Sequence, residues 1–328
     1  MAKVRFGIIG CGSMGRGHAG QITGAKAKDF CLAAVSDIVG ERAEKLGDAH
    51  SVPWFTDNVK LMESGLVDAV IIATPHYAHP PLTIQAARRK LHVLCEKPIA
   101  SSIGPARAMV AECKKRRVAM GVMFQQRNRP EMRKMKTMVA RGDVGEVYRV
   151  EMLCSSWYRT QSYYNSGTWR GTWDGEGGGV LINQAPHSLD LFTWIGGMPK
   201  RVVATICTRH HKIEVENTAN AIMDYGNGRT GYLYATTACA PGVEQMTVCG
   251  DRGTLGARRR LNCCAISRRG RISSRASGYR PASSSRFVSP CSIASRHSSR
   301  TRTRAISSTA LTSSAAGGDF TISFTNPP

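Results

Sequence analysis

The sequence predicts an α/β protein in which a doubly wound parallel sheet is followed by a second α/β domain with an open, mostly antiparallel sheet. Three observations predict this fold. Apolar strands alternate with helical segments up to residue 123, and short strands separated by turns follow from about residue 144. The last 72 residues contain only 11 Leu, Ile, Val and Phe, too few to build a core. We therefore expect domains at 1–123 and 124–256, then an irregular segment at 257–328.

A glycine-rich turn follows the first predicted strand. The strand at 4–9 leads directly into Gly10, Gly12 and Gly15, and a helix-compatible run comes after them. Glycines permit a sharp strand-to-helix turn, and the free N–H groups of the helix start can then bind a pyrophosphate. This predicts a Rossmann nucleotide-binding domain, with a plain tight turn as the alternative. The predicted cofactor contacts of this turn are Gly10, Gly12, Ser13, Met14 and Gly15.

The second predicted strand, FCLAAVSD, ends in Asp37, 22 residues after Gly15. A carboxylate at this position can accept hydrogen bonds from both adenosine ribose hydroxyls, and it would repel a 2′-phosphate. Asp37 therefore favours NAD over NADP. The alternative role, capping the next helix, is compatible with the first.

The alternation continues with apolar strands at 67–75, 91–98 and 118–124, separated by helical segments that include 102–116. Ligands of such a sheet bind at the carboxyl ends of its strands. We expect Thr74, Pro75, Glu96 and Lys97 to lie at these ends.

Lys97 follows a buried strand, near the expected place of the nicotinamide, so it can stabilise a developing alkoxide. A surface lysine is the alternative. The Lys97–Pro98 bond is a candidate cis peptide. In a second cluster, GEGGGVLINQAPHSLDLF, Asn183 and His187 are four residues apart and share one face of an expected helix. His187 is the best candidate base because its ordinary pKa lies near neutrality, although a core histidine is the alternative, and Asp190 would cap or orient a neighbour.

Aromatic residues and strands complete the second domain. The segment SYYNSGTWRGTW at 162–173 suits ordinary aromatic packing or a carbohydrate surface better than a nucleic-acid platform. Alternating strands surround YGNGRTG, a hairpin signal, and VCGDRGTL starts another hairpin, but its expected return strand is replaced by GARRRLNCC.

Composition changes abruptly near Gly256. The 328 residues carry a net charge of +22, and the segment 257–328 contributes +12 of it through 13 Arg, no Lys and one acid, together with 17 Ser. Such a change is typical of a GC-rich gene read out of frame, so we expect a frameshift near codon 256. The alternative is a basic tail that binds phosphate groups of nucleic acid, which its few aromatic residues disfavour.

Eleven scattered cysteines without CxxC spacing predict reduced, mostly buried thiols and disfavour a metal site. With no apolar run of membrane-spanning length and no room for a signal peptide before the first strand, we expect a cytoplasmic protein.

In this order and spacing, the motifs GIIGCGSMGRGH, ATPHYAH, HVLCEKP, WRGTWDGEGGG and NQAPHSLDL resemble the Gfo/Idh/MocA oxidoreductases over residues 3–256. The resemblance implies a Rossmann domain joined to an open-sheet domain, and NAD(P)-dependent oxidation or reduction of a sugar or cyclitol by a homodimer or homotetramer. It implies that Lys97 is the catalytic lysine and His187 the proton-transfer residue. Two positions depart from the family pattern, since Asn183 replaces the usual Asp and His76 the usual Asn.

The predicted site follows from these motifs. The catalytic residues are Lys97, His187 and Asn183. The substrate would contact these three together with Gln126 and Tyr164. The further cofactor contacts are Asp37, Thr74, Pro75, His79, Glu96, Lys97, Trp169 and Arg170. We expect NAD rather than NADP, a polyol or sugar substrate, and neither a metal nor a membrane or nucleic-acid partner. A non-catalytic NAD-binding regulator with a nucleic-acid-binding tail is the alternative function.

Overall fold

The structure, a computed structural model, describes residues 3–24, 29–259 and 320–325. The chain divides into two compact units, one comprising residues 1–263 and 320–328 and the other 264–319. All described residues belong to the first unit. Most of the predicted Arg- and Ser-rich tail, for which nucleic-acid binding was the alternative, lies outside the described residues.

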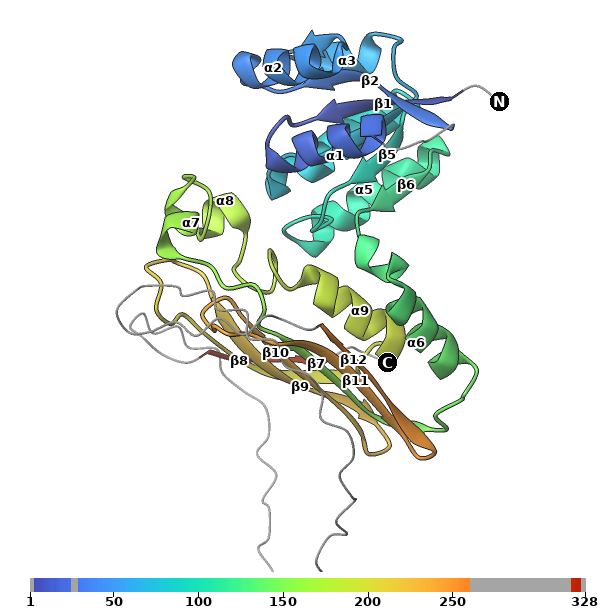
Figure 1. Cartoon of the computed structure of the whole chain (residues 1–328), viewed down its shortest axis with the longest axis vertical. Coiled ribbons are helices and arrows are strands. Elements are labelled where there is room, and N and C mark those ends of the chain that lie inside the picture. Colours follow the sequence, from blue (N-terminus) through green and yellow to red (C-terminus); the bar gives the residue numbers. More distant parts are fainter. Residues whose placement is uncertain (1–2, 25–28, 260–319, 326–328) are drawn as a thin grey trace, which may run out of the picture. The chain divides into compact units, whose positions relative to one another are not determined.

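The first sheet has six parallel strands in the order β3-β2-β1-β4-β5-β6 (Figure 1). Its strands are β1 (Val4–Ile9), β2 (Phe30–Ser36), β3 (Trp54–Phe55), β4 (Ala69–Ile72), β5 (His92–Cys95) and β6 (Met120–Val122). The helices between them are α1 (Ser13–Gly24), α2 (Gly40–His50), α3 (Asn58–Glu63), α4 (His79–Arg88) and α5 (Ile103–Arg116), with a 3-10 turn, η1 (His76–Ala78). Strand order reverses between β1 and β4, which creates the crevice where doubly wound sheets bind ligands.

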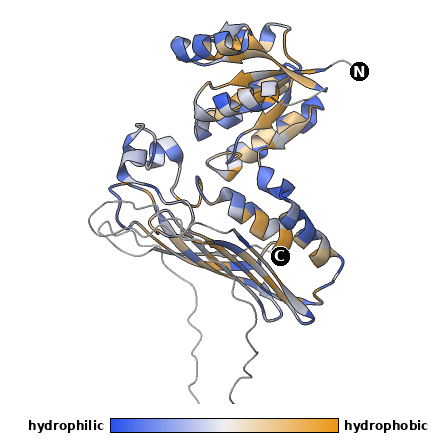
Figure 2. Cartoon of the chain, viewed as in Figure 1, coloured by the Kyte–Doolittle hydropathy of each residue, from blue (hydrophilic) through white to orange (hydrophobic). Residues whose placement is uncertain are grey.

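Buried apolar strands stabilise this sheet. The sheet strands are largely coloured as hydrophobic in Figure 2. In β1 and β4, Ile8, Ile9, Val70 and Ile72 have no exposed surface. Helices on both faces complete two core clusters, as a doubly wound sheet requires. The prediction of a Rossmann-type first domain is confirmed.

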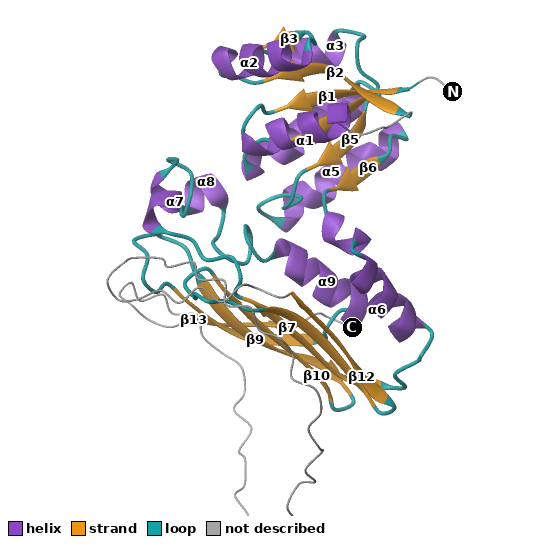
Figure 3. Cartoon of the chain, in the orientation of Figure 1, coloured by secondary structure: helices purple, strands orange, loops and turns teal. Residues whose placement is uncertain are grey.

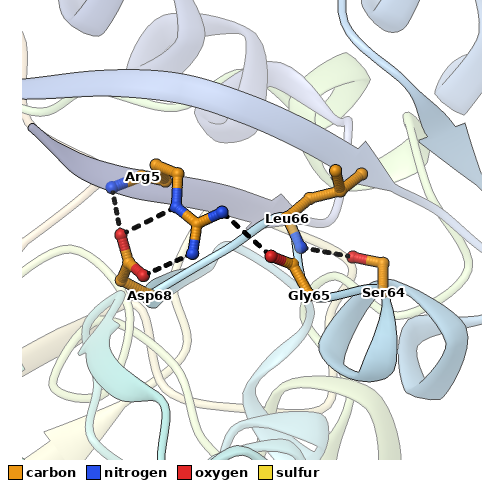
Figure 4. Close-up of polar contacts among 5 residues, drawn as sticks. All are labelled: Arg5, Ser64, Gly65, Leu66 and Asp68. Atoms are coloured by element: carbon orange, nitrogen blue, oxygen red, sulfur yellow. Dashed lines mark hydrogen bonds and ion pairs between the residues drawn. The ribbon is translucent and has the colours of Figure 1, made fainter.

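An ion pair joins the amino-terminal ends of β1 and β4. Arg5 donates through its backbone N (2.9 Å), Nε (3.1 Å) and Nη2 (2.7 Å) to Asp68, and through Nη1 to the Gly65 carbonyl oxygen, as Figure 4 shows. These hydrogen bonds lower the pKa of Asp68 to about 2. The pair holds β1 and β4 in register, so that their carboxyl ends lie side by side at the edge of the sheet where folds of this kind bind ligands.

The second sheet has seven strands in the order β12-β11-β7-β10-β9-β8-β13. Among the described strands of this sheet, only β7 and β10 pair in parallel, so the sheet is mixed and mostly antiparallel, as predicted. Its strands are β7 (Val147–Cys154), β8 (Arg201–Cys207), β9 (Thr218–Gly226), β10 (Arg229–Thr236), β11 (Glu244–Gly250), β12 (Gly253–Arg259) and β13 (Phe320–Thr325).

One face of this sheet is packed with helices, as Figure 3 shows for α6 and α9. The helical elements of this part are η2 (Gln125–Asn128), α6 (Pro130–Ala140), α7 (Gln161–Asn165), α8 (Trp173–Glu176) and α9 (Pro186–Gly196). Phe192 of α9 and Leu233 of β10 are fully buried in the resulting core.

The predicted hairpin at YGNGRTG is confirmed. Asn227 and Gly228 connect β9 to β10 with φ angles of 54° and 74°, and such left-handed turns match the twist of the strands they join.

Two expectations for the C-terminal segment need correction. The return strand that seemed missing after VCGDRGTL is β12, which pairs with β11 as far as Arg259 and so passes the expected boundary at residue 256. The segment at 257–328 is also not irregular throughout, because Phe320–Thr325 pairs with β8 as β13. Both strands form because backbone hydrogen bonds to an existing strand edge require no particular side-chain composition.

Candidate active site

The glycine turn between β1 and α1 has the geometry of a nucleotide cradle. Gly10 has a φ of 97°, and a Cβ there would lie 2.6 Å from the carbonyl oxygen of Ala73. A Cβ on Gly15 would lie 1.9 Å from the carbonyl oxygen of Gly10, so both positions require glycine. A Cβ on Gly12 would meet no atom within 4 Å. Gly12 therefore leaves open space at the start of α1, where Ser13 and Met14 are exposed.

Asp37 connects this turn to the end of β2. Its carboxylate is buried and accepts hydrogen bonds from the backbone N–H groups of Cys11 (2.7 Å) and Val39 (2.9 Å). Since α2 begins at Gly40 after an N-cap at Val39, the Asp37 side chain braces the turn and does not cap that helix. A carboxylate has about four acceptor positions, so Asp37 retains two for ribose hydroxyls. The glycine turn and the Asp37 carboxylate therefore fit the pyrophosphate and the ribose hydroxyls of NAD.

The ends of β4 and β5 carry further predicted contacts. The buried Thr74 Oγ1 has no hydrogen-bond partner among the described residues, which suits contact with a bound cofactor. Pro75 is exposed beside it. Glu96 is buried, and its two oxygens contact His18 Nε2 (2.8 Å) and the backbone N of Lys97 (3.1 Å). Burial opposes ionisation of Glu96, but these hydrogen bonds outweigh it and lower its pKa.

His79 occupies a different environment from the one expected. It is 0% exposed, and its ring nitrogens lie 2.8 Å from the Pro98 carbonyl oxygen and 2.9 Å from the Thr74 carbonyl oxygen. Neither nitrogen is left to contact a cofactor. This environment favours a positioning role for His79, which links the end of β4 to the cis Lys97–Pro98 peptide.

Lys97 lies where the sequence placed it, two residues after the end of β5. Its Nζ donates to the carbonyl oxygen of Asn183 (2.9 Å) and lies 3.5 Å from Asn183 Oδ1. Burial lowers the pKa of Lys97, while the charges of Glu96 and Glu176 raise it. The structure thus joins two motifs that are 86 residues apart.

His187 is the second residue of α9. Its ring packs edge-on against Phe124, with centroids 5.9 Å apart, and its buried Nδ1 has no partner among the described residues. Burial, followed by the nearby Lys97 charge, lowers the pKa of His187. The imidazole is therefore neutral at physiological pH and able to accept a proton.

The expected shared helix face of Asn183 and His187 is incorrect. Asn183 lies in the turn before α9, where its N–H donates to the Gly179 carbonyl oxygen (3.0 Å). The helix begins only at Pro186, because proline favours the first helical position. Asp190 accepts a two-pronged hydrogen bond from Arg127 and so orients a neighbour.

The aromatic segment contributes one residue that the sequence missed. Tyr164 is buried, and its hydroxyl lies 2.8 Å from Thr237 Oγ1, which turns it away from substrate contact. The adjacent Tyr163 lies closer to the predicted machinery, since its hydroxyl accepts from Arg170 Nη1 (2.6 Å) and lies 3.5 Å from Asn183 Nδ2. Two adjacent tyrosines in one motif point in different directions, and sequence spacing alone does not choose between them.

Other predicted residues surround this group. The Arg170 guanidinium lies 4.5 Å from the Trp169 ring centroid, and Trp169 packs edge-on against His76 at 5.7 Å. His76 is buried, donates through Nδ1 to the Glu176 carbonyl oxygen (2.8 Å), and has its pKa lowered to about 4 by burial. Gln126 is half-buried in η2, where its Oε1 lies 3.4 Å from Arg129 Nη1.

Comparison with known proteins identifies the family. Residues 4–124 match the model of an oxidoreductase family with an NAD-binding Rossmann fold, and residues 132–256 match the GFO/IDH/MocA C-terminal domain. The chain belongs to the GFO/IDH/MocA family. The resemblance seen in its motifs is confirmed.

Relatives of this family agree in sequence and in structure. The WlbA dehydrogenase of Bordetella pertussis, solved in complex with NADH and UDP-GlcNAcA, is 30% identical with a TM-score of 0.73, over 78% of this chain and 79% of that one. An inositol 2-dehydrogenase of Rubrobacter xylanophilus is 32% identical over 58% of this chain and 52% of its own length. The rhizopine catabolism protein MocA of Rhizobium meliloti is 27% identical over 79% of both chains.

The chain is thus an NAD-dependent oxidoreductase of the GFO/IDH/MocA family, and the prediction of NAD as cofactor is confirmed. Within the part of the chain that the structure describes, every helix is too short or too polar to cross a membrane. Eight cysteines fall in this part, all of them free and five of them buried.

Proposed function

We propose that this GFO/IDH/MocA protein oxidises a secondary hydroxyl of a sugar or cyclitol, with His187 as the proton acceptor and Lys97 as the cation that stabilises the alkoxide. The observation that carries the proposal is the 2.9 Å hydrogen bond from Lys97 Nζ to the Asn183 carbonyl oxygen, which brings the strand-end lysine to the segment leading into His187. When bound, NAD accepts the carbinol hydrogen as hydride.

Each residue has a physical role in this proposal. The neutral His187 can take the hydroxyl proton, because its pKa is lowered and it lies in the first turn of α9. Burial lowers the pKa of Lys97, and the charges of Glu96 and Glu176 oppose this shift. In this proposal the Lys97 ammonium stabilises the negative charge that develops as the proton leaves. Asn183 holds Lys97 in place.

The substrate class rests on the surrounding side chains and on the relatives. The Arg170 guanidinium stacks on the rings of Tyr163 and Trp169. Aromatic side chains of this kind match the C–H faces of a sugar ring, while polar tips bind hydroxyls. One relative is named for inositol, and another was solved with a nucleotide sugar. We extend this polyhydroxylated class to the present chain.

A screen of sugars, nucleotide sugars and cyclitols tests the substrate class. We expect at least one of them to reduce NAD, and NADP to be used less well because Asp37 would repel its 2′-phosphate. NADH formation is followed by absorbance with the two cofactors in parallel. If only substrates without ring hydroxyls react, the proposed class is wrong.

The pH profile of kcat/KM tests the two titrating groups. Oxidation needs neutral His187 and charged Lys97, so we expect activity to fall below the His187 pKa and above the Lys97 pKa. Burial lowers both pKa values, so the acid limb lies below the ordinary 6.5 of histidine and the alkaline limb below the ordinary 10.5 of lysine. Initial rates across the stable pH range check this, and an acid limb that persists in His187→Ala would contradict it.

We also propose that the protein forms a homodimer through the outer face of the second sheet. Val203 of β8 and Ile222 of β9 are register partners on this face and are 46% and 60% exposed. Exposed apolar residues that adjoin one another favour association. Sedimentation velocity of the parent and of Ile222→Asp tests the dimer, which the substitution should dissociate.

We also propose a cytoplasmic location, in keeping with the free cysteines of the described residues.

We retain the proposal of a frameshift near codon 256. The match to the C-terminal domain model ends at residue 256, where the composition changes. The pairing of β13 with β8 favours the opposite view, that the later residues belong to the fold. Resequencing the gene decides between the two, because an uninterrupted frame in independently read DNA would exclude the frameshift.

A further inference from the structure

Glu176 is a buried carboxylate beside the proposed machinery, and the predicted roles did not include it. It is the last residue of α8 and is 1% exposed. Its Oε2 accepts from the backbone N–H of Gly171 (2.7 Å), and its Oε1 accepts from Asn183 Nδ2. Both oxygens therefore face hydrogen-bond donors, as an ionised carboxylate requires.

The Asn183 amide lies between this carboxylate and Lys97. Its Nδ2 faces Glu176, and its Oδ1 lies 3.5 Å from Lys97 Nζ. A carboxylate can only accept hydrogen bonds, so it selects the NH₂ end of the amide and leaves the oxygen end for the ammonium. If the amide were reversed, two acceptors would face each other at Glu176 and two donors at Lys97.

We propose that Glu176 is a positioning residue for Lys97, which it serves by orienting the Asn183 amide and by adding, to the charge of Glu96, a second negative charge that favours the ammonium form. The relevance of this role to turnover rests on the function proposed above, but the effect on Lys97 does not. The charge of Glu176 reaches Lys97 and raises its pKa, while burial raises the pKa of Glu176 itself. The hydrogen bonds from Gly171 and Asn183 and the nearby charges of Arg170 and Lys97 favour its ionised form.

Glu176→Gln is the decisive variant. The new amide has nearly the same size and can still accept from Gly171, but its NH₂ group would face the NH₂ group of Asn183. Asn183 would then rotate and present a donor to Lys97. Loss of the negative charge, together with this donor, lowers the Lys97 pKa, because both disfavour the ammonium form.

The Lys97 pKa can be measured without turnover. Competitive acetylation with acetic anhydride, read by mass spectrometry across a pH series, gives the titration of Lys97 in the protein without substrate or cofactor. We expect the midpoint to fall by about one pH unit or more in Glu176→Gln, as for loss of an opposite charge nearby. A midpoint equal to that of the parent overturns the proposal.

A matched control lies between β8 and β9 and binds the loop that follows Glu176. Glu216 is also buried and accepts two backbone N–H groups, those of Gly179 (2.9 Å) and Leu181 (3.0 Å), without contacting Asn183. Glu216→Gln removes a buried carboxylate from the same region, yet it should leave the Lys97 midpoint unchanged. An equal shift in both variants would mean that Lys97 responds to loosening of the loop, which overturns a specific role for Glu176.

The double variant Glu176→Gln with Asn183→Asp exchanges amide and carboxylate across one hydrogen bond. A carboxylate then faces Lys97 directly, and we expect the Lys97 midpoint to return to or above the parent value. Failure to return overturns the proposal.

If Glu176→Gln does not fold, Glu176→Asp replaces it. The negative charge then remains, but the side chain is one methylene shorter and the carboxylate lies farther from Asn183. The Lys97 midpoint should then stay near the parent value while kcat/KM falls, and an unchanged kcat/KM overturns the positioning role.

In the kinetics, we expect kcat/KM of Glu176→Gln to fall about tenfold, with an alkaline limb at lower pH and an unchanged Kd for NAD. A failed substrate screen would refute the function proposed above and leave the Lys97 titration interpretable. A normal screen with an unshifted titration would refute only the role of Glu176.

Discussion

Replacement of Lys97 with alanine is expected to lower kcat about 10³-fold while leaving the Kd for NAD within about twofold. The variant removes the buried cation that the 2.9 Å bond to Asn183 holds beside the segment leading into His187. The negative charge that develops as the substrate hydroxyl loses its proton would then have no positive partner. The glycine turn and Asp37, which are the proposed cofactor contacts, lie on other strand ends and are unchanged.

His187→Ala is expected to lower kcat about 10²- to 10⁴-fold, the usual range for loss of a positioned proton acceptor. Stopped-flow or steady-state rates with the substrate found in the screen, and fluorescence titration with NADH, provide the two measurements. Lys60→Ala is the control, because Lys60 is exposed on α3. Near-normal turnover in both Lys97→Ala and His187→Ala would refute the assignment of the site.

The second large effect is expected at the glycine turn, where Gly15→Ala and Gly12→Ala should differ in their effects on stability and on NAD binding. In Gly15→Ala the new Cβ would lie 1.9 Å from the Gly10 carbonyl oxygen, so the β1–α1 turn must open. We expect the free energy of unfolding to fall by about 1–3 kcal/mol and NAD binding to be lost. Chemical denaturation and NADH titration measure the two effects.

Gly12→Ala should keep its stability, because its Cβ would meet no protein atom within 4 Å, but it should weaken NAD binding about tenfold or more by filling the space that the pyrophosphate needs. Gly17→Ala is the matched control, since its Cβ also meets nothing and it lies in the body of α1. We expect it to be neutral or slightly stabilising, because alanine is favoured within helices. Normal NAD affinity in Gly12→Ala would place the cofactor elsewhere.

The departures from the predicted site concern packing. His79 and Tyr164 were predicted to contact ligands, yet each places its polar side-chain atoms against other protein groups. Glu176 and Tyr163 were not predicted to contribute, yet both contact Asn183. Residue type and motif membership locate the neighbourhood of a site, whereas rotamers and neighbouring loops decide which side chain faces it.

The sequence by itself determined the features that depend on local patterns. Ala69–Ile72 and the second half of Val4–Ile9 are buried because apolar strand residues must be covered on both faces, and Gly10 and Gly15 are required where the backbone makes a sharp turn. Lys97 lies at a strand end for the same local reason. Only the tertiary structure decided that Lys97 meets Asn183, that Glu176 orients this amide, and that Phe320–Thr325 pairs with β8. These contacts join segments distant in sequence, and they form because packing and hydrogen bonding of the whole fold bring those segments together.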